Sequence, residues 1–266
     1  MSGRFALGRA RCWALAGAIA ALIGAEAAAQ GGLPPGFVFL RDVDPSIAQD
    51  IRYAGADNFV GRPLSGYDAA ECVLRREVAA ALKRVQVDLR QLRLALKVYD
   101  CYRPERAARA MAQWATDGRS ELGTKRFFPR VEKRRLFALG YIAASSRHSA
   151  GTAVDLTLIE ADGARAAAFD PTARYAPCTG PAGQRSPDNS IDMGTGYDCF
   201  DVNSHMASHA ITAEQQKRRA LLVSAMKRHG FSNYFREWWH FSFPAAATGW
   251  HHDFPIPRRQ AKAHAE

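Results

Sequence analysis

The sequence predicts a single α+β domain with a small, mostly antiparallel sheet and flanking helices. A helical repeat over residues 74–92 runs directly into an extended apolar segment at 94–99. Two further segments, 152–159 and 238–243, alternate between the two faces of a strand. Their order lacks the regular strand–helix alternation of a doubly wound parallel sheet. These three observations favour an α+β architecture.

The first half of the chain contains one long helix, one strand and a second helix. Apolar residues recur at steps of three and four from Leu74 to Leu92, which predicts a helix with one buried stripe. Residues 94–99 form the predicted strand. Pro104 then opens a helix that runs to about Ala115, because proline is tolerated in a first turn. Residues 31–70 are loop-rich, and 117–145 are ambiguous apart from a short helix expected near 132–139.

The second half adds two strands and one helix. Residues 152–159 predict a strand, and 160–190 predict an irregular insertion rich in Asp, Gly, Pro and Ala. Thr212 and Gln215 form a capping-box pattern that opens a helix, and Gly230 suits the position after its end. Residues 238–243 form the last predicted strand.

The N-terminus has the layout of a secretory signal peptide over residues 1–29. Arg4, Arg9 and Arg11 precede an apolar run, and Ala27–Ala29 supply small residues for cleavage. A single membrane anchor is the alternative, but the run is short and rich in alanine. We therefore expect an exported protein, periplasmic or extracellular, without stable membrane insertion. The domain covers residues 30–257, and a polar tail covers 258–266.

The chain is basic, with a formal net charge of +10. Its Lys and Arg residues are scattered, apart from short runs in helix-like segments such as 133–135 and 217–219. This distribution argues against a nucleic-acid partner. Attraction to an anionic cell envelope explains it more simply. The sequence leaves the oligomeric state open.

Four cysteines remain after the predicted cleavage. An even number in an exported protein indicates two disulfides, for which three pairings exist. We favour Cys72 with Cys101 and Cys178 with Cys199. A structural metal is the alternative, but the sequence contains no close C-x-x-C pair.

Two stretches supply the parts of a catalytic zinc site. His148 and Asp155 lie within one ten-residue segment, and Glu237 and His240 follow about eighty residues later. Two imidazoles and one carboxylate suit Zn²⁺ with a fourth position open for water. The spare carboxylate, Glu237, is the expected base that takes a proton from that water and passes it to the leaving amine.

The geometry of these residues sets two expectations. Gly151 permits a tight turn that brings His148 back over the strand carrying Asp155. Because residues three apart on a strand face opposite sides, Glu237 and His240 require an irregular turn just before the last strand. The rival ligand cluster is His251-His252-Asp253, where adjacent histidines usually diverge. Taken singly, each histidine or aspartate could equally be a satisfied polar group or a cap.

The chain resembles the VanX-type zinc D-Ala-D-Ala dipeptidases, which share the hedgehog/D,D-peptidase fold. The resemblance extends from about Asp50 to Phe254. It implies one zinc ion per chain, held by His148, Asp155 and His240, with Glu237 as base. It rests on six segments: Asp50–Tyr53, Asn58–Phe59, Tyr99–Pro104, Ser146–Thr157, Met193–His205 and Glu237–Phe241.

The resemblance assigns three further site residues. Arg103 matches the arginine that stabilises the tetrahedral intermediate, and a fixed guanidinium can bind the developing oxyanion. Its alternative role is an ion pair with Asp100 or Glu105. Asp198, together with Ser146, matches the positions that hold the free amino end of the substrate. The alternative for Asp198 is a loop cap.

The sequence thus predicts an exported zinc metallopeptidase that hydrolyses D-Ala-D-Ala to two D-alanines in cell-wall peptide turnover or salvage. One alternative is a D,D-carboxypeptidase that trims peptidoglycan stem peptides, since it shares the metal motifs. The other is a non-catalytic, hedgehog-like zinc-binding module. The presence of both Glu237 and Arg103 argues against the latter, because a structural zinc site needs neither.

Overall fold

A computed structural model describes residues 32–119, 123–143, 145–246 and 251–259. The predicted signal peptide lies outside these residues, as does the polar tail from residue 260. Everything below concerns the compact unit that begins at Leu33. No helix in the part of the chain that the structure describes is long and apolar enough to cross a bilayer.

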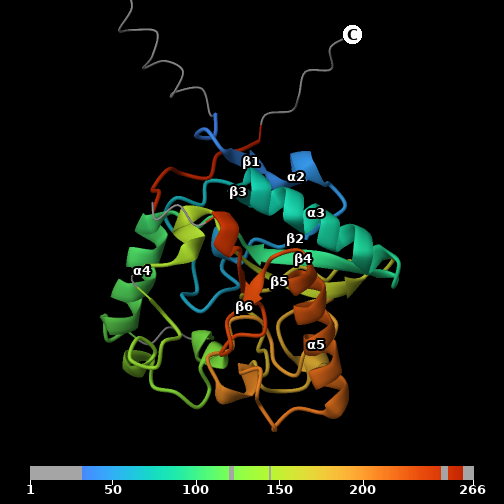
Figure 1. The fold of residues 1–266 in the computed structure, drawn as a ribbon. Coiled ribbons are helices and arrows are strands. Elements are labelled where there is room, and N and C mark those ends of the chain that lie inside the picture. The colour runs from blue at the N-terminus through green and yellow to red at the C-terminus, as the bar shows by residue number, and fades with distance from the viewer. Residues whose placement is uncertain (1–31, 120–122, 144, 247–250, 260–266) are drawn as a thin grey trace, which may run out of the picture. The chain divides into compact units, whose positions relative to one another are not determined.

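A five-stranded sheet forms the centre of the unit, in the order β2-β4-β5-β7-β6 (Figure 1). Only the β2–β4 pair is parallel, and the other three neighbouring pairs are antiparallel. A two-stranded antiparallel sheet, β1-β3, lies beside it. The prediction of a small, mostly antiparallel sheet is confirmed. The strands are β1 (Phe37–Phe39), β2 (Ala48–Gln49), β3 (Val73–Arg75), β4 (Leu94–Asp100), β5 (Ala153–Glu160), β6 (Ser232–Asn233) and β7 (His240–Ser242).

Helix α3 (Arg76–Arg90) confirms the apolar stripe that the sequence predicts. Val78, Leu82 and Leu89 are completely buried. The ends differ from the prediction: Leu74 belongs to β3, and Leu92 is exposed in the turn that follows the helix. A prediction from apolar spacing alone therefore makes the helix two residues too long at each end.

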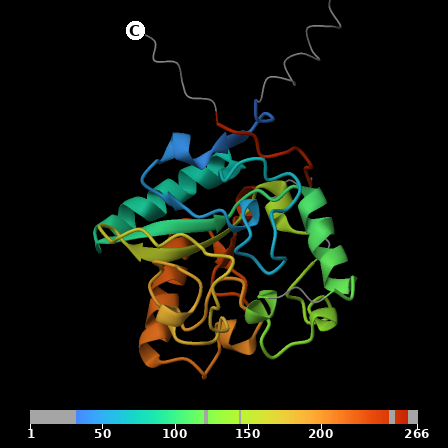
Figure 2. The ribbon, with the colours of Figure 1, turned by 180° about the vertical axis from the view of Figure 1, so that it is seen from behind.

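The other predicted helices are confirmed at their capping residues. Helix α4 (Glu105–Thr116) begins directly after Pro104. Helix α5 (Ala213–Arg228) has both hydrogen bonds of the capping box between Thr212 and Gln215. Gly230 lies just beyond it with a φ of 90°. In both views α3 lies above the long strands and α5 below them, while α4 stands at one end (Figures 1 and 2). A short helix, α2 (Leu40–Val43), follows β1.

Two segments are less regular than predicted. The helix expected near 132–139 is only a 3₁₀ turn at Lys133–Arg135. The last strand begins at His240, because Trp238 and Trp239 lie in a turn where both rings are buried. The Trp238 indole N–H donates to Thr195 Oγ1 at 2.8 Å. Further 3₁₀ turns are Arg52–Ala54, Thr124–Phe127, Arg147–Ala150, Ala182–Gln184, Val202–Ser204 and Pro244–Ala246.

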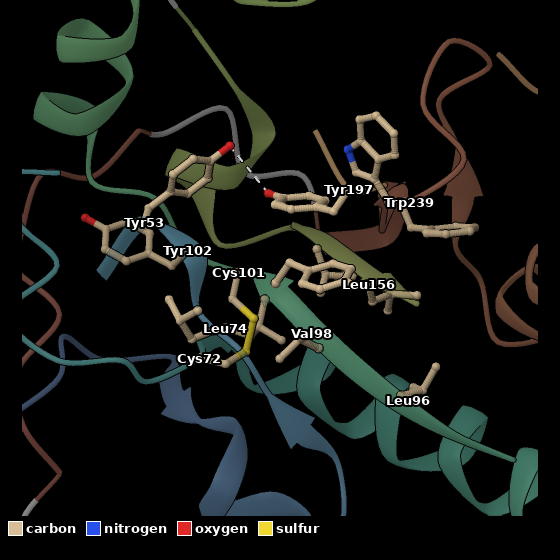
Figure 3. Close-up of a cluster of buried hydrophobic side chains, with 14 of the residues drawn as sticks. Tyr53, Cys72, Leu74, Leu96, Val98, Cys101, Tyr102, Leu156, Tyr197 and Trp239 are labelled. Carbon is tan, nitrogen blue, oxygen red and sulfur yellow. Dashed lines mark hydrogen bonds between the residues drawn. A yellow bond between two sulfur atoms is a disulfide. The ribbon is translucent and has the colours of Figure 1, made fainter. Parts of the chain in front are cut away.

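Both favoured disulfides are present, Cys72–Cys101 and Cys178–Cys199. The first ties the residue before β3 to the residue after β4, within the buried cluster of Figure 3. The second joins residues 21 positions apart and closes one end of the irregular insertion. Each loop of this size is worth about 3 kcal/mol in the loop-entropy account.

The carboxylate of Asp188 helps to fix the insertion to the sheet, together with contacts of Asn189 and Ser190. Asp188 accepts a hydrogen bond from the Tyr99 hydroxyl at 2.7 Å and pairs with Arg52 at 3.1 Å. It also pairs with Lys97 of β4. Because Lys97 and Arg52 are nearly inaccessible to solvent, an isolated charge on either would be costly. Asp188 compensates Lys97 and shares Arg52 with Asp50 and Asp57.

Candidate active site

Strand register places three polar side chains side by side at one end of the sheet. Asp100 of β4 pairs with Asp155 of β5, and Asp155 pairs with His240 of β7. Directly opposed residues on neighbouring strands project to the same face. Two carboxylates and one imidazole therefore meet there: Asp100 ends β4, His240 begins β7, and Asp155 is the third residue of β5.

His148 reaches this group from the loop that precedes β5. Ser146 caps the 3₁₀ turn Arg147–Ala150 by accepting the His148 backbone N–H at 3.2 Å. Gly151 then reverses the chain with a φ of 71°. The His148 Nδ1 donates to the carbonyl oxygen of Cys101 at 2.6 Å. Since a carbonyl only accepts, the proton is on Nδ1, and Nε2 offers its lone pair to the site.

Three ligand-type atoms form a nearly equilateral triangle. His148 Nε2 lies 3.2 Å from His240 Nδ1 and 3.3 Å from Asp155 Oδ1. His240 Nδ1 lies 3.0 Å from Asp155 Oδ1. Tetrahedral zinc with bonds of about 2.0–2.1 Å places its ligand atoms about 3.3 Å apart. The triangle therefore fits a metal ion in both spacing and donor chemistry.

No other group of three such side chains that could hold a metal lies within the described ranges. The rival cluster does not assemble. His252 Nε2 faces the Arg75 guanidinium at 3.0 Å, and Asp253 pairs with Arg106 and Arg109 at 2.9 and 3.0 Å. These contacts fix the C-terminal segment to α4.

The charges of the triangle are strongly coupled. Burial opposes ionisation of Asp155, but the two imidazoles outweigh it through charge and hydrogen bonds and hold its pKa well below the usual value. Burial lowers the pKa of His240, although Asp155 partly opposes this. An ionised aspartate and a neutral imidazole are the forms that bind a divalent metal.

Glu237 lies beside the triangle, as the predicted irregular turn requires. Its backbone N–H donates to Tyr234, and its carbonyl oxygen accepts from His240 N at 3.3 Å, which closes a turn just before β7. One carboxylate oxygen lies 3.9 Å from His240 Nδ1, and the side chain is 12% exposed. Burial, and then the charges of Asp155 and Asp198, raise the pKa of Glu237 well above its usual value.

Arg103 forms the ion pair with Asp100 that was its alternative role, and it also faces the triangle. Its Nε and Nη2 each lie 2.8 Å from Asp100, and Nη2 lies 3.6 Å from Asp155. The alternative partner, Glu105, pairs with Arg109 instead. These contacts, together with a hydrogen bond to Tyr67, hold the guanidinium beside the triangle. The guanidinium carbon lies 5.1 Å from the centre of the Tyr53 ring, within the range of a cation–π contact.

Asp198 and Ser146 lie in the same site. Asp198 is 4% exposed and accepts the Tyr53 hydroxyl at 2.7 Å. Its carboxylate caps no backbone N–H among the described residues, so the loop-cap alternative is not observed. Burial, followed by the charge of Asp155, raises the pKa of Asp198 well above its usual value. A cationic group beside Asp198 would relieve this burial cost.

All seven predicted site residues line one cavity of about 240 Å³. This is smaller than the roughly 300–1,000 Å³ of pockets that hold drug-sized ligands. Its apolar walls come from Phe59, Phe200 and Trp239. The seven residues are Arg103, Ser146, His148, Asp155, Asp198, Glu237 and His240.

The sequence did not reveal the hydroxyl groups behind the site. The Tyr197 hydroxyl donates to Asp155 Oδ2 at 3.0 Å, and it lies 3.4 Å from the Tyr53 hydroxyl (Figure 3). Tyr67 similarly donates to Asp100 at 2.7 Å. Tyr53 and Tyr197 lie within segments that carry the family resemblance, which is the only signal the sequence offered.

Comparison with known proteins identifies the family. The chain matches the M15 peptidases described as D-Ala-D-Ala dipeptidase over residues 34–170 and 183–260. The chain belongs to this D-Ala-D-Ala dipeptidase family. M15 peptidases are metallopeptidases, and this chain is therefore a hydrolase of that class.

Named relatives of this M15 peptidase share most of its length. A D-alanyl-D-alanine dipeptidase of Enterococcus faecium is 31% identical over 77% of this chain and 90% of its own. The D-alanyl-D-alanine dipeptidase of Streptomyces coelicolor is 33% identical over 83% of this chain and 98% of its own length. The D-alanyl-D-alanine dipeptidase of Escherichia coli is 29% identical over 79% of this chain and 86% of its own length. The unmatched internal residues 171–182 belong to the irregular insertion.

Replacement of Gly151 in this M15 peptidase is expected to lower both stability and metal binding. A Cβ at this position would lie 2.4 Å from the Phe37 ring, so Gly151→Ala must displace either the buried ring or the loop that holds His148. We expect a loss of more than about 2 kcal/mol in unfolding free energy, together with reduced metal binding. Urea unfolding and metal titration measure the two effects.

Gly118→Ala is the matched control. Gly118 also has a positive φ, of 67°, but a Cβ at this position would have nothing within 4 Å. The Gly118→Ala variant therefore measures the cost of backbone strain alone. Equal losses in the two variants would show that the contact with Phe37 does not position the loop.

Proposed function

We propose that this protein is an exported, zinc-dependent D,D-dipeptidase that hydrolyses D-Ala-D-Ala to two D-alanines. The triangle of His148, Asp155 and His240 with Glu237 beside it, in a small cavity, is the observation that carries the proposal. The names of the relatives, all D-alanyl-D-alanine dipeptidases, support the substrate.

The three ligands would be His148 Nε2, Asp155 and His240 Nδ1, and two nitrogens with one carboxylate favour zinc. When bound, zinc polarises the peptide carbonyl and lowers the pKa of water toward about 7. Cys101 orients His148 through its carbonyl, and Tyr197 orients Asp155 through its hydroxyl. Such outer contacts fix the direction of each ligand.

Glu237 acts as the base and then as the acid. Its carboxylate accepts a proton from the attacking water and donates it to the amine that leaves. The raised pKa of Glu237 suits this task, because burial makes the protonated form of this carboxyl easier to reach. The Arg103 guanidinium, held beside Asp155 by Asp100 and Tyr67, would stabilise the oxyanion.

Asp198 and Ser146 bind the free ammonium group of the substrate. A buried carboxylate that lacks a cationic partner favours a substrate that brings its own positive charge. This requirement distinguishes a dipeptidase from a D,D-carboxypeptidase, whose substrate continues beyond that position as a peptide chain. The small cavity supports the same choice.

A substrate comparison tests the proposal directly. We expect the zinc-loaded enzyme to hydrolyse free D-Ala-D-Ala at least about 100-fold more efficiently than an N-acylated peptide ending in D-Ala-D-Ala, because an unpaired buried carboxylate rejects the blocked amine. Product D-alanine is measured for both. Preference for the blocked peptide would instead establish the D,D-carboxypeptidase.

Asp198→Asn is expected to weaken this discrimination. The amide cannot pair with the ammonium group, so kcat/KM for D-Ala-D-Ala should fall by about 10- to 100-fold, while the slow reaction with the N-acylated peptide changes little. Steady-state kinetics on both substrates provide the measurement. A uniform loss on both would assign Asp198 to the structure of the cavity rather than to recognition.

Export is proposed from the N-terminal sequence and supported by two disulfides, which persist in oxidising compartments. The mature domain would cover residues 30–257. Outside the cytoplasm the dipeptide would come from cell-wall turnover, which favours salvage of D-alanine. Fractionation of cells that express the full chain, with sequencing of the mature N-terminus, tests both the location and the cleavage site.

A further inference from the structure

We propose that Arg147 binds the C-terminal carboxylate of the substrate. This inference deepens the proposed function and rests on it. A dipeptide carries two charges, and Asp198 accounts only for the ammonium end. The carboxylate of the departing residue requires a cation in the same cavity.

Arg147 lines the cavity, and the residue is exposed to solvent. Its side chain makes no hydrogen bond or ion pair with any residue that the structure describes. Its backbone, in contrast, is fixed: the carbonyl oxygen accepts the N–H and hydroxyl of Thr152 at 3.2 and 3.3 Å. The residue thus combines an anchored main chain with an unoccupied guanidinium.

The charges around the cavity single out this arginine. Three carboxylates line it, those of Asp155, Asp198 and Glu237. The only other arginine there, Arg103, has already committed Nε and Nη2 to carboxylates. Among the described residues that line the cavity, Arg147 is the one cation available for a whole carboxylate.

The chemistry of arginine suits this ligand. A guanidinium presents paired N–H donors that match the two oxygens of a carboxylate. Arg147 directly follows Ser146, which the proposed function assigns to the ammonium end, and directly precedes His148. One rigid turn would therefore supply contacts to both charged ends of a molecule only two residues long.

The experiment compares D-Ala-D-Ala with its C-terminal amide in the zinc-loaded enzyme. We expect the wild type to prefer the acid. Arg147→Ala should lower kcat/KM for the acid by about 10- to 100-fold, mainly through KM, and change the reaction of the amide by less than about threefold. Arg147→Lys should retain part of the preference, since it keeps the charge without the paired donors.

Arg134→Ala is the matched control, because it removes one arginine charge from a side chain that is 82% exposed and absent from the cavity wall. Circular dichroism establishes that each variant is folded. An unchanged acid-to-amide ratio in Arg147→Ala overturns the inference and leaves the proposed function intact.

A binding measurement separates the two proposals. Calorimetric titration of D-Ala-D-Ala and its amide reports recognition without turnover. If the wild type hydrolyses neither compound, the proposed function fails. In that case weaker binding of the acid, but not of the amide, to Arg147→Ala still supports a carboxylate site, and equal binding to wild type and variant overturns it.

Discussion

Replacing Glu237 with glutamine is expected to reduce kcat by about 10³-fold while leaving the bound zinc in place. Glutamine has nearly the same shape but cannot accept the proton of the attacking water, and general base catalysis contributes about 10²–10⁴-fold. The carboxylate lies 3.9 Å from His240 Nδ1 rather than within the triangle, so metal affinity should not depend on it. Steady-state kinetics and metal analysis of the same preparation measure both quantities.

The Glu237→Gln variant also has an expected effect on stability. Burial raises the pKa of Glu237 in the folded, metal-free protein above its pKa in the unfolded chain. The folded state therefore loses stability as the pH rises above the pKa of the unfolded chain, because this carboxyl ionises more readily there. The neutral amide carries no such cost. Metal-free Glu237→Gln should therefore be at least as stable as wild type at pH 7 in urea unfolding.

Glu214→Gln provides the control, because Glu214 is an exposed residue in the first turn of α5. It should change neither kcat nor metal content. A Glu237→Gln enzyme that retains kcat within tenfold of wild type would show that another group accepts the proton. Loss of zinc from that variant would assign Glu237 to the metal instead.

The arrangement of the site was predictable where a local pattern determines it. Gly151 turns the chain and returns His148 to the strand of Asp155, and residues three apart around β7 demand the irregular turn at Glu237. Strand register was not predictable, since it depends on pairing between β4 and β5. Register is what places Asp155 opposite Asp100, so that Arg103, which pairs locally with Asp100, also lies 3.6 Å from Asp155.

Contacts between distant segments limited the prediction in other places. Tyr197 reaches Asp155 across 42 positions of sequence, and no local signal distinguishes its hydroxyl from any buried tyrosine. The helix expected near 132–139 is a single 3₁₀ turn at Lys133–Arg135. Its Lys133 instead pairs with Asp117 and lies 4.2 Å from the Trp114 ring, contacts that the helical pattern does not anticipate.

Asp155→Asn is expected to abolish both metal binding and turnover. Asp155 lies at the centre of the triangle's contacts: His148, His240, Tyr197 and Arg103 all lie within 3.6 Å of its carboxylate. Asparagine keeps the volume but removes the anion that a divalent ion requires. Metal analysis after dialysis should give far less than one equivalent of zinc, and D-alanine release should be undetectable.

Thermal unfolding distinguishes loss of the metal from collapse of the site. Zinc that binds only the folded state at about 1,000 times its Kd adds about 4 kcal/mol, which corresponds to a shift on the order of 10 °C in Tm for a domain of this size. Chelation should lower the wild-type Tm by this amount and leave that of Asp155→Asn unchanged. Asp162→Asn, at a side chain that is 82% exposed, should respond to chelation as the wild type does. An Asp155→Asn protein whose Tm still falls on chelation would retain its metal, and the ion would then be held without this carboxylate.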